Sequence, residues 1–418
     1  MTSTILLRPR PYAQQSGSFA LVALLPPPKP VPALPSEIWT GIFEFLSAGS
    51  EALWFLLRVC KLFKDLALPL VYARVQLSKI SSLHKFTARL LSAEDGWDSI
   101  RRVPWSAPGR WVQTLDLSAI ACVDALILDS LLVTVFPLIP FLGKLSMNSS
   151  NRFTLSGRAM DALGQRQGAA NLRVLEGISY VPSGLAAEEP LTKLLRCLPN
   201  LEELEVIGRG LDPTEMDFSA ISLPDSFLPL QLPCLRTLTI ISVYSSSLFL
   251  SLLLSPLPAL QKLTITPSHD VPPSLSSQFI ATHGTSLRSL LLFTPKSWPT
   301  RLLPSPHSIL CTSPTLRHLS LEKPLPAQLD LPAGNANTHP LQILSIPRPD
   351  AEFWSVLDRL LPRLPLLCMV RARDVRWLRK GMGLRAQEAG VQGEMREWKR
   401  RLARRRIRMV DAEWNECE

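Results

Sequence analysis

Residues 201–206 read LEELEV, and the same short pattern returns as LRTLTI at 235–240 and as LQKLTI at 260–265. Leucine occupies the first and fourth positions of each copy, and the fourth position is flanked by polar residues. Alternation of apolar and polar residues is typical of a β-strand that buries one face. Nine copies can be aligned, at 111–117, 142–147, 172–177, 201–206, 235–240, 260–265, 287–292, 316–321 and 341–346.

Proline precedes four of the copies by two residues, at Pro199, Pro233, Pro258 and Pro314. Proline ends a helix and biases the residue before it towards extended backbone, so this position is typical of a helix-to-strand junction. The pattern therefore predicts helices between the strands. The candidates are 191–198, 246–254, 275–282 and 353–361.

Strand-plus-helix units that recur every 25 to 34 residues resemble leucine-rich repeats. The resemblance implies an α/β fold: a solenoid over residues 111–370, with parallel strands inside and helices outside. We expect nine or ten units, the tenth being a weaker candidate at 364–369. The alternative is chance clustering in a leucine-rich chain, and the regular spacing and the proline markers argue against it.

Residues 34–74 predict three short helices. Ser36 can cap the first helix, Gly49 is expected to end it, and Pro69 is expected to end the third. Helices of about two turns each cannot bury all the apolar side chains of this segment, so we expect a partner or a neighbouring domain to cover the remainder. The surplus comprises Ile38, Trp39, Ile42, Phe43, Phe45, Leu46, Trp54 and Phe55.

Two blocks of this segment resemble the F-box. The first is Leu34-Pro35-Ser36-Glu37-Ile38, and the second is Leu56-Leu57-Arg58-Val59-Cys60-Lys61-Leu62-Phe63. They match the family's opening Leu-Pro-x-Glu-Ile/Leu and its later Leu-x-x-Val-Cys-(Lys/Arg)-x-Phe/Trp, in that order, over about 40 residues. Trp54 and Phe55 depart from the family, which often has Asp-Leu there, and this leaves the start of the second helix open.

The resemblance implies a short all-α module at 34–74 that docks on the Skp-type adaptor of a cullin–RING, SCF-type ubiquitin ligase. An alternative is that the module is only a helical cap on the repeats. The matched positions would form its core and its adaptor-facing surface: Leu34, Pro35, Ile38, Ile42, Leu46, Leu57, Val59, Cys60 and Phe63.

Taken with the repeats, the chain is similar to F-box proteins with leucine-rich repeats. That likeness implies a substrate-recognition subunit for protein degradation in the cytoplasm or the nucleus. Such a subunit is not an enzyme, since it acts by holding a target protein near the ligase. A repeat-based scaffold without a ligase role is the alternative.

The target is expected on the inner face of the solenoid. Side chains that flank the second leucine of each strand should lie there, opposite to the buried leucines. Glu176, Glu203 and Glu205 would form an acidic strip suited to a basic peptide, and an ordinary solvated face is the alternative. The candidate target-binding residues are Asp116, Glu176, Glu203, Glu205, Lys262 and His318.

Positive charge is concentrated near the C-terminus. Residues 371–410 hold 14 Lys/Arg and 4 Asp/Glu, whereas the whole chain has a net charge of +10. Residues 371–418 thus predict a basic tail with a helix. A solvated tail, a nuclear-import patch and contact with nucleic acid or acidic lipid are the open readings, and we do not expect nucleic acid to be the main partner.

The remaining segments are a disordered proline-rich leader at 1–33 and a connector or N-terminal cap at 75–110. The chain has no apolar run long enough to span a membrane. Its seven scattered cysteines favour reduced thiols. We find no phosphate-binding glycine loop, no metal-ligand spacing and no catalytic signature, so we expect no cofactor, no metal and no catalytic residue.

Overall fold

The chain divides into two compact units, Met1–Val71 and Tyr72–Glu418. We describe them from a computed structural model. The described residues are 7–9, 21–23, 34–46, 50–95, 107–121, 124–148, 153–181, 189–208, 228–243, 246–267, 274–295, 304–332, 338–377 and 390–416.

The first unit contains the three helices expected at 34–74. They are α1 (Ser36–Leu46), α2 (Ser50–Leu56) and α3 (Lys61–Ala73), the last two residues of α3 belonging to the second unit. Cys60 lies just before α3, and its Sγ accepts a hydrogen bond from the N–H of Phe63 at 3.4 Å. This contact satisfies one of the free backbone donors at the start of that helix.

Pro69 does not end α3, so our prediction of that boundary was wrong. The helix continues to Ala73 because residues on both sides of the proline pack in the core: Ala67 is buried, and Leu70 and Val71 are partly buried. Their burial offsets the ~3 kcal/mol cost of a proline inside a helix.

The expected disordered leader contains two paired strands. Leu7–Pro9 (β1) and Leu21–Ala23 (β2) pair antiparallel, with Leu7 opposite Ala23. Leucine and valine suit an extended, paired backbone, which the proline content of this segment had obscured. The remainder of the leader lies outside the described residues.

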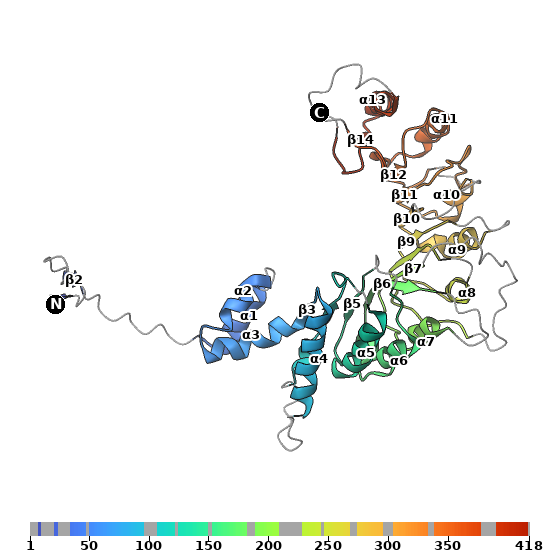
Figure 1. Cartoon of the computed structure of the whole chain (residues 1–418). Helices are drawn as coiled ribbons and strands as arrows, with labels where there is room; N and C mark the ends of the chain where they lie inside the picture. Colours follow the sequence, from blue (N-terminus) through green and yellow to red (C-terminus); the bar gives the residue numbers. More distant parts are fainter. Residues whose placement is uncertain are drawn as a thin grey trace. The chain divides into compact units, whose positions relative to one another are not determined.

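The second unit is built on one sheet of twelve strands, all parallel, in chain order from β3 to β14. Figure 1 shows the strands lining the inner side of an arc and the helices lying on its outer side. The strands are Arg74–Gln76 (β3), Thr114–Asp116 (β4), Lys144–Ser146 (β5), Val174–Tyr180 (β6), Glu203–Gly208 (β7), Thr237–Ile241 (β8), Lys262–Ile265 (β9), Ser289–Leu292 (β10), His318–Ser320 (β11), Ile343–Ile346 (β12), Met369–Ala372 (β13) and Arg408–Val410 (β14).

Helices occur between most of the strands, including near the four segments predicted to be helical. They are Ile80–Asp95 (α4), Ala125–Val135 (α5), Gly157–Gln165 (α6), Pro190–Arg196 (α7), Ser247–Leu254 (α8), Leu275–His283 (α9), Ile309–Thr312 (α10), Ala351–Leu360 (α11) and Gly390–Ala403 (α13). This α/β arrangement is solenoid-like, because each strand–helix unit packs on the next.

A ladder of apolar side chains runs through the middle of the sheet. The second leucine of each predicted strand pairs with its counterpart on the next strand, and every member from Leu115 to Leu344 is at most 2% exposed. The ladder residues are Val75, Leu115, Leu145, Leu175, Leu204, Leu238, Leu263, Leu290, Leu319, Leu344, Val370 and Met409.

The sheet extends beyond both ends that we predicted for the solenoid. Residues 74–95, where we expected a connector or an N-terminal cap from residue 75, form its first strand and helix. Strand β13 at 369–372 lies a few residues after the weaker tenth copy expected at 364–369, and β14 adds a strand beyond it. These strands carry Val75, Val370 and Met409 in the ladder instead of leucine. Other apolar residues fill the same site, so a search for leucine misses them.

Helix α13 belongs to the folded body and is not a separate tail. Met395, Trp398 and Leu402 lie on one face of this helix and are buried in the core of the second unit. Trp398 meets Trp354 of α11 edge to face, with ring centroids 4.9 Å apart. The arginines of the helix lie on its other faces, and their number hid the apolar stripe in the composition.

Buried polar side chains link neighbouring strand–helix repeats within the second unit. Arg166 donates to the carbonyl oxygens of Ile139, Pro140 and Leu142 at 2.9–3.1 Å. Burial lowers the pKa of Arg166 to about 10. The ring of His339 similarly lies 3.0 Å from the carbonyl oxygen of Ser313. Such bonds satisfy backbone groups in the turns between these strand–helix repeats.

Replacing Trp398 with alanine should destabilise the second unit. Removal of a large buried ring costs about 3–5 kcal/mol, so the urea midpoint followed by circular dichroism should fall clearly. Arg404→Ala, on the exposed side just after the helix, is the matched control and should change stability by about 0.5 kcal/mol or less. Equal midpoints for the two variants would show that α13 is not part of the core.

Candidate protein-interaction surfaces

The core of the first unit is small. Phe43 packs against Trp39 and Phe63, with ring centroids 6.0 and 5.0 Å away. Among the residues of this unit whose burial the structure describes, Phe43, Leu53 and Ala67 are the buried members of the core. A core of this size leaves much of the apolar surface of the three helices uncovered.

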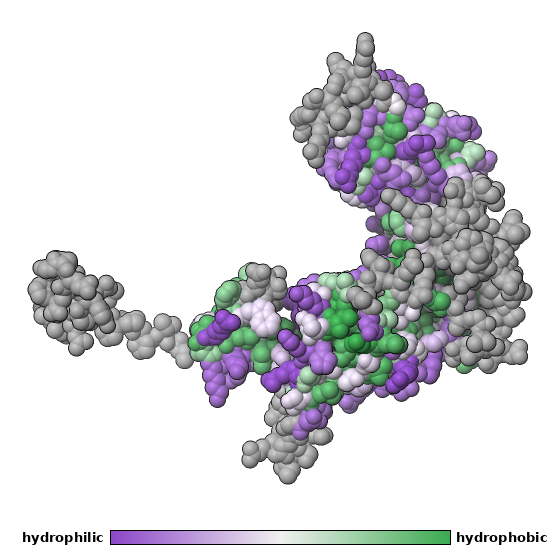
Figure 2. Space-filling view, in the orientation of Figure 1, coloured by the Kyte–Doolittle hydropathy of each residue, from purple (hydrophilic) through white to green (hydrophobic). Residues whose placement is uncertain are grey.

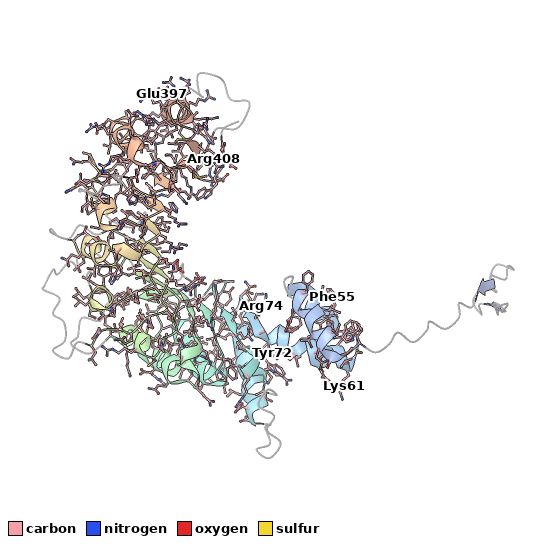
Figure 3. The ribbon with its side chains drawn as sticks, turned by 180° about the vertical axis from the view of Figure 1, so that it is seen from behind. Phe55, Lys61, Tyr72, Arg74, Glu397 and Arg408 are labelled. Carbon is pink, nitrogen blue, oxygen red and sulfur yellow. The ribbon has the colours of Figure 1, made fainter. Side chains whose placement is uncertain are left out.

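Nine large apolar side chains of these helices and their turns are exposed, and we call them the N-terminal apolar surface. The described part of the chain exposes nineteen such side chains, so almost half of them fall between residues 34 and 62. Green, hydrophobic atoms reach the surface of this unit in Figure 2, and Phe55 projects from α2 in Figure 3. The nine are Leu34, Ile38, Ile42, Phe45, Leu46, Trp54, Phe55, Val59 and Leu62.

Seven of the nine residues predicted to face or support an adaptor are exposed: Leu34, Pro35, Ile38, Ile42, Leu46, Val59 and Cys60. The other two, Leu57 and Phe63, are half-buried and pack on the small core. The seven exposed residues thus form surface, and the two half-buried residues support that surface from the core. Adaptor binding itself stays a prediction.

The sequence-based set missed three of the most exposed members of this surface. Phe45 is 86% exposed, Phe55 71% and Trp54 61%. All three belong to the apolar surplus that the residue count had identified, but the F-box resemblance assigned none of them to the adaptor-facing surface, and Trp54 and Phe55 depart from the family pattern. The surplus also included Trp39 and Phe43, which the structure places in the core.

The second candidate surface is the inner face of the sheet. Side chains on either side of the ladder residues contact one another between strands, as expected for one face. Gln76 Nε2 donates to Asp116 Oδ2 at 3.2 Å, and Lys144 Nζ lies 2.8 Å from Glu176 Oε1. The candidate residue Asp116 therefore lies on this face beside the first strand.

The three glutamates of the expected acidic strip lie on adjacent strands. Glu176 is held by Lys144, and Glu205 Oε2 accepts a hydrogen bond from the N–H of Gly177 at 3.0 Å. This bond forms where the register of β6 and β7 shifts. Glu203 is exposed. The strip exists, but Lys144 neutralises part of its charge.

Lys262 and His318 lie on the same face further along the sheet. His318 Nε2 is 3.1 Å from Ser345 Oγ. Burial, together with the smaller effect of the nearby cations Arg371 and Lys262, lowers the pKa of His318 to about 4. His318 is therefore neutral at neutral pH. Sequence reasoning missed Arg371, because it placed residue 371 beyond the end of the solenoid.

Neither a metal site nor a membrane-spanning helix is found among the described residues. No cluster of three His, Cys, Asp or Glu side chains that could hold a metal ion occurs among them. None of the helices formed by these residues is long and apolar enough to cross a bilayer. No protein-family model matches the chain, and no curated protein matches it.

Because of His318, the free energy of unfolding should decrease as the pH is lowered. Its folded-state pKa lies below the ordinary 6.5, so the unfolded chain takes up a proton first and the stability contributed by neutral His318 is lost as pH falls from 6.5 towards 4. The wild-type protein should therefore lose about 1 kcal/mol more than His318→Gln between about pH 6 and pH 5. Urea unfolding at both pH values measures this difference, and parallel losses would contradict the assignment.

Proposed function

We propose that this chain is a substrate-recognition subunit of an SCF-type ubiquitin ligase. Its helices α1–α3 act as an F-box that docks on the Skp-type adaptor, and its solenoid, built of leucine-rich repeats, binds the target protein. The observation that carries the proposal is the N-terminal apolar surface, which contains five of the nine positions that the F-box resemblance assigns to the module's core and adaptor-facing surface: Leu34, Ile38, Ile42, Leu46 and Val59.

The energetics favour a bound helical partner. Half-exposed aliphatic and aromatic side chains contribute on the order of 1 kcal/mol each when a partner covers them. Nine of them together offset a large part of the rotational, translational and ordering cost of association. An apolar patch of this density on so small a unit is typical of a protein–protein interface.

In the proposed mechanism the chain performs no bond chemistry. The adaptor anchors one unit and the solenoid holds the target, so lysines of the target reach a high local concentration near the ubiquitin-charged enzyme. A protein with this role works in the cytoplasm or the nucleus. A repeat scaffold with no ligase role predicts partners on the solenoid alone.

Charge introduced into the N-terminal apolar surface should abolish adaptor binding. Ile38 is 50% exposed, and an aspartate there would be desolvated without a partner in the interface. We expect Ile38→Asp to reduce recovery of a purified Skp-type adaptor on the immobilised full chain by more than tenfold, and Leu34→Ala with Pro35→Ala to act in the same direction.

The matched control is Leu366→Asp, because Leu366 is an exposed leucine, 54% accessible, in the second unit. It should leave adaptor recovery unchanged. Circular dichroism checks that the helices are retained in each variant. Recovery that Ile38→Asp and the double alanine variant leave intact would rule out F-box docking and favour the scaffold alternative.

A further inference from the structure

The inner face of the sheet is divided by charge along its length. On strands β4–β7 it carries the carboxylates of Asp116, Glu176, Glu203 and Glu205 against the single cation Lys144. Lys144 and Glu176 keep side-chain exposures of 40% and 31% while paired. This part of the face is therefore solvent-accessible and net negative, and Glu203 is exposed.

The middle of the inner face is neutral. Thr237 and Thr239 of β8 lie opposite Glu203 and Glu205 in the register, and Thr264 of β9 lies opposite Thr239, whereas Lys262 of the same strand begins the positive part. Ser289 then continues the row on β10. Short hydroxyl side chains separate the acidic part from the part that follows.

The opposite part of the inner face is positively charged. Lys262, Arg371 and Arg408 belong to β9, β13 and β14, with His318 between them on β11. The guanidinium of Arg371 lies 4.2 Å from the ring centroid of Trp414, which is 46% exposed. Figure 3 labels Arg408, and hydrophilic atoms gather at this end of the unit in Figure 2.

The carboxylates at this end are engaged by other groups. Glu322 binds Arg373 and accepts a hydrogen bond from the N–H of Thr294. Asp411 accepts hydrogen bonds from the N–H groups of Trp377, Glu413 and Asn415. Glu416 lies 3.4 Å from Arg408. Of these three, Asp411 offsets part of the charge of Arg371 and Glu416 offsets that of Arg408. The three cations Lys262, Arg371 and Arg408 still outnumber these two carboxylates, so this part of the face keeps a small net positive charge.

We infer that the inner face binds a target segment with opposite charges at its two ends. A basic stretch lies over β5–β7 and an acidic stretch lies over β13–β14, and the spacer between them passes Lys262 of β9. This inference rests on the proposed role of the solenoid in holding a target, and it replaces the purely basic peptide that the acidic strip alone suggested. Complementary charge at both ends also specifies the direction in which the segment lies.

Strand spacing sets the length of such a segment. Six strand-to-strand steps separate β7 from β13, and at ~4.8 Å each they span roughly 29 Å. An extended peptide covers ~3.3 Å per residue, so about eight residues separate the two charged stretches. A nucleic acid fits this face poorly, because the carboxylates of β6 and β7 repel a uniform polyanion.

Fluorescence anisotropy with labelled synthetic peptides and the full chain tests the inference. One probe has a block of lysines, a neutral spacer of about eight residues and a block of glutamates; a second has the same composition with the charges alternating, and a third has glutamates alone. We expect the block peptide to bind at least about fivefold more tightly than either of the others. Arg371→Glu and Glu203→Lys should each weaken it about tenfold.

Arg400→Glu is the matched control, since it makes the same charge change on the exposed side of α13, next to Glu397, and it should leave peptide binding unchanged. Equal affinity for the block and alternating peptides, including no binding of either, would overturn the inference. So would binding of a single-stranded RNA oligonucleotide that Arg371→Glu removes. The adaptor is absent from this experiment, so its outcome is independent of F-box docking.

Discussion

The structure depends on the burial of one side chain per strand. From Val75 to Met409, each strand of the sheet contributes one apolar residue to a continuous ladder, and a strand–helix unit cannot bury that residue alone. Stacking the units covers the ladder on both sides. Because side chains alternate along a strand, the same constraint places the flanking polar residues on the opposite, inner face. The candidate target-binding surface is thus a geometric consequence of how the core is built.

The first unit, unlike the second, is too small to bury most of its apolar side chains. Its three helices are too short to enclose their own apolar residues, and so Phe45, Trp54 and Phe55 stay in contact with water. In the second unit, length solves this problem, since each added repeat buries the face of its neighbour. In the first unit only another molecule or another part of the chain can cover the surplus, and this difference underlies the assignment of separate binding roles to the two units.

Much of the fold could be predicted from the sequence. The nine leucine-marked strands, the helices that follow them and the three N-terminal helices are local patterns, and each is readable within about ten residues. The ends of the solenoid were only partly predicted: residues 75–110 were left as a connector or a cap, and the tenth copy was placed at 364–369, because Val75, Val370 and Met409 take the place of leucine. Helix α13 was misread for a related reason. Its arginines dominate the composition, whereas three buried side chains decide where the helix lies.

The sequence by itself determined the repeat, the period-two alternation and the apolar surplus between residues 38 and 55, because each follows from residue order alone. Only the tertiary structure decided which residues make up each surface. It showed that Lys144 partly neutralises the acidic strip and that Arg371 lies on the same face as Lys262. The residues brought together in these two cases are 32 or more positions apart in the sequence. Contacts between strands depend on the register in which the sheet stacks, and no local pattern specifies that register in advance.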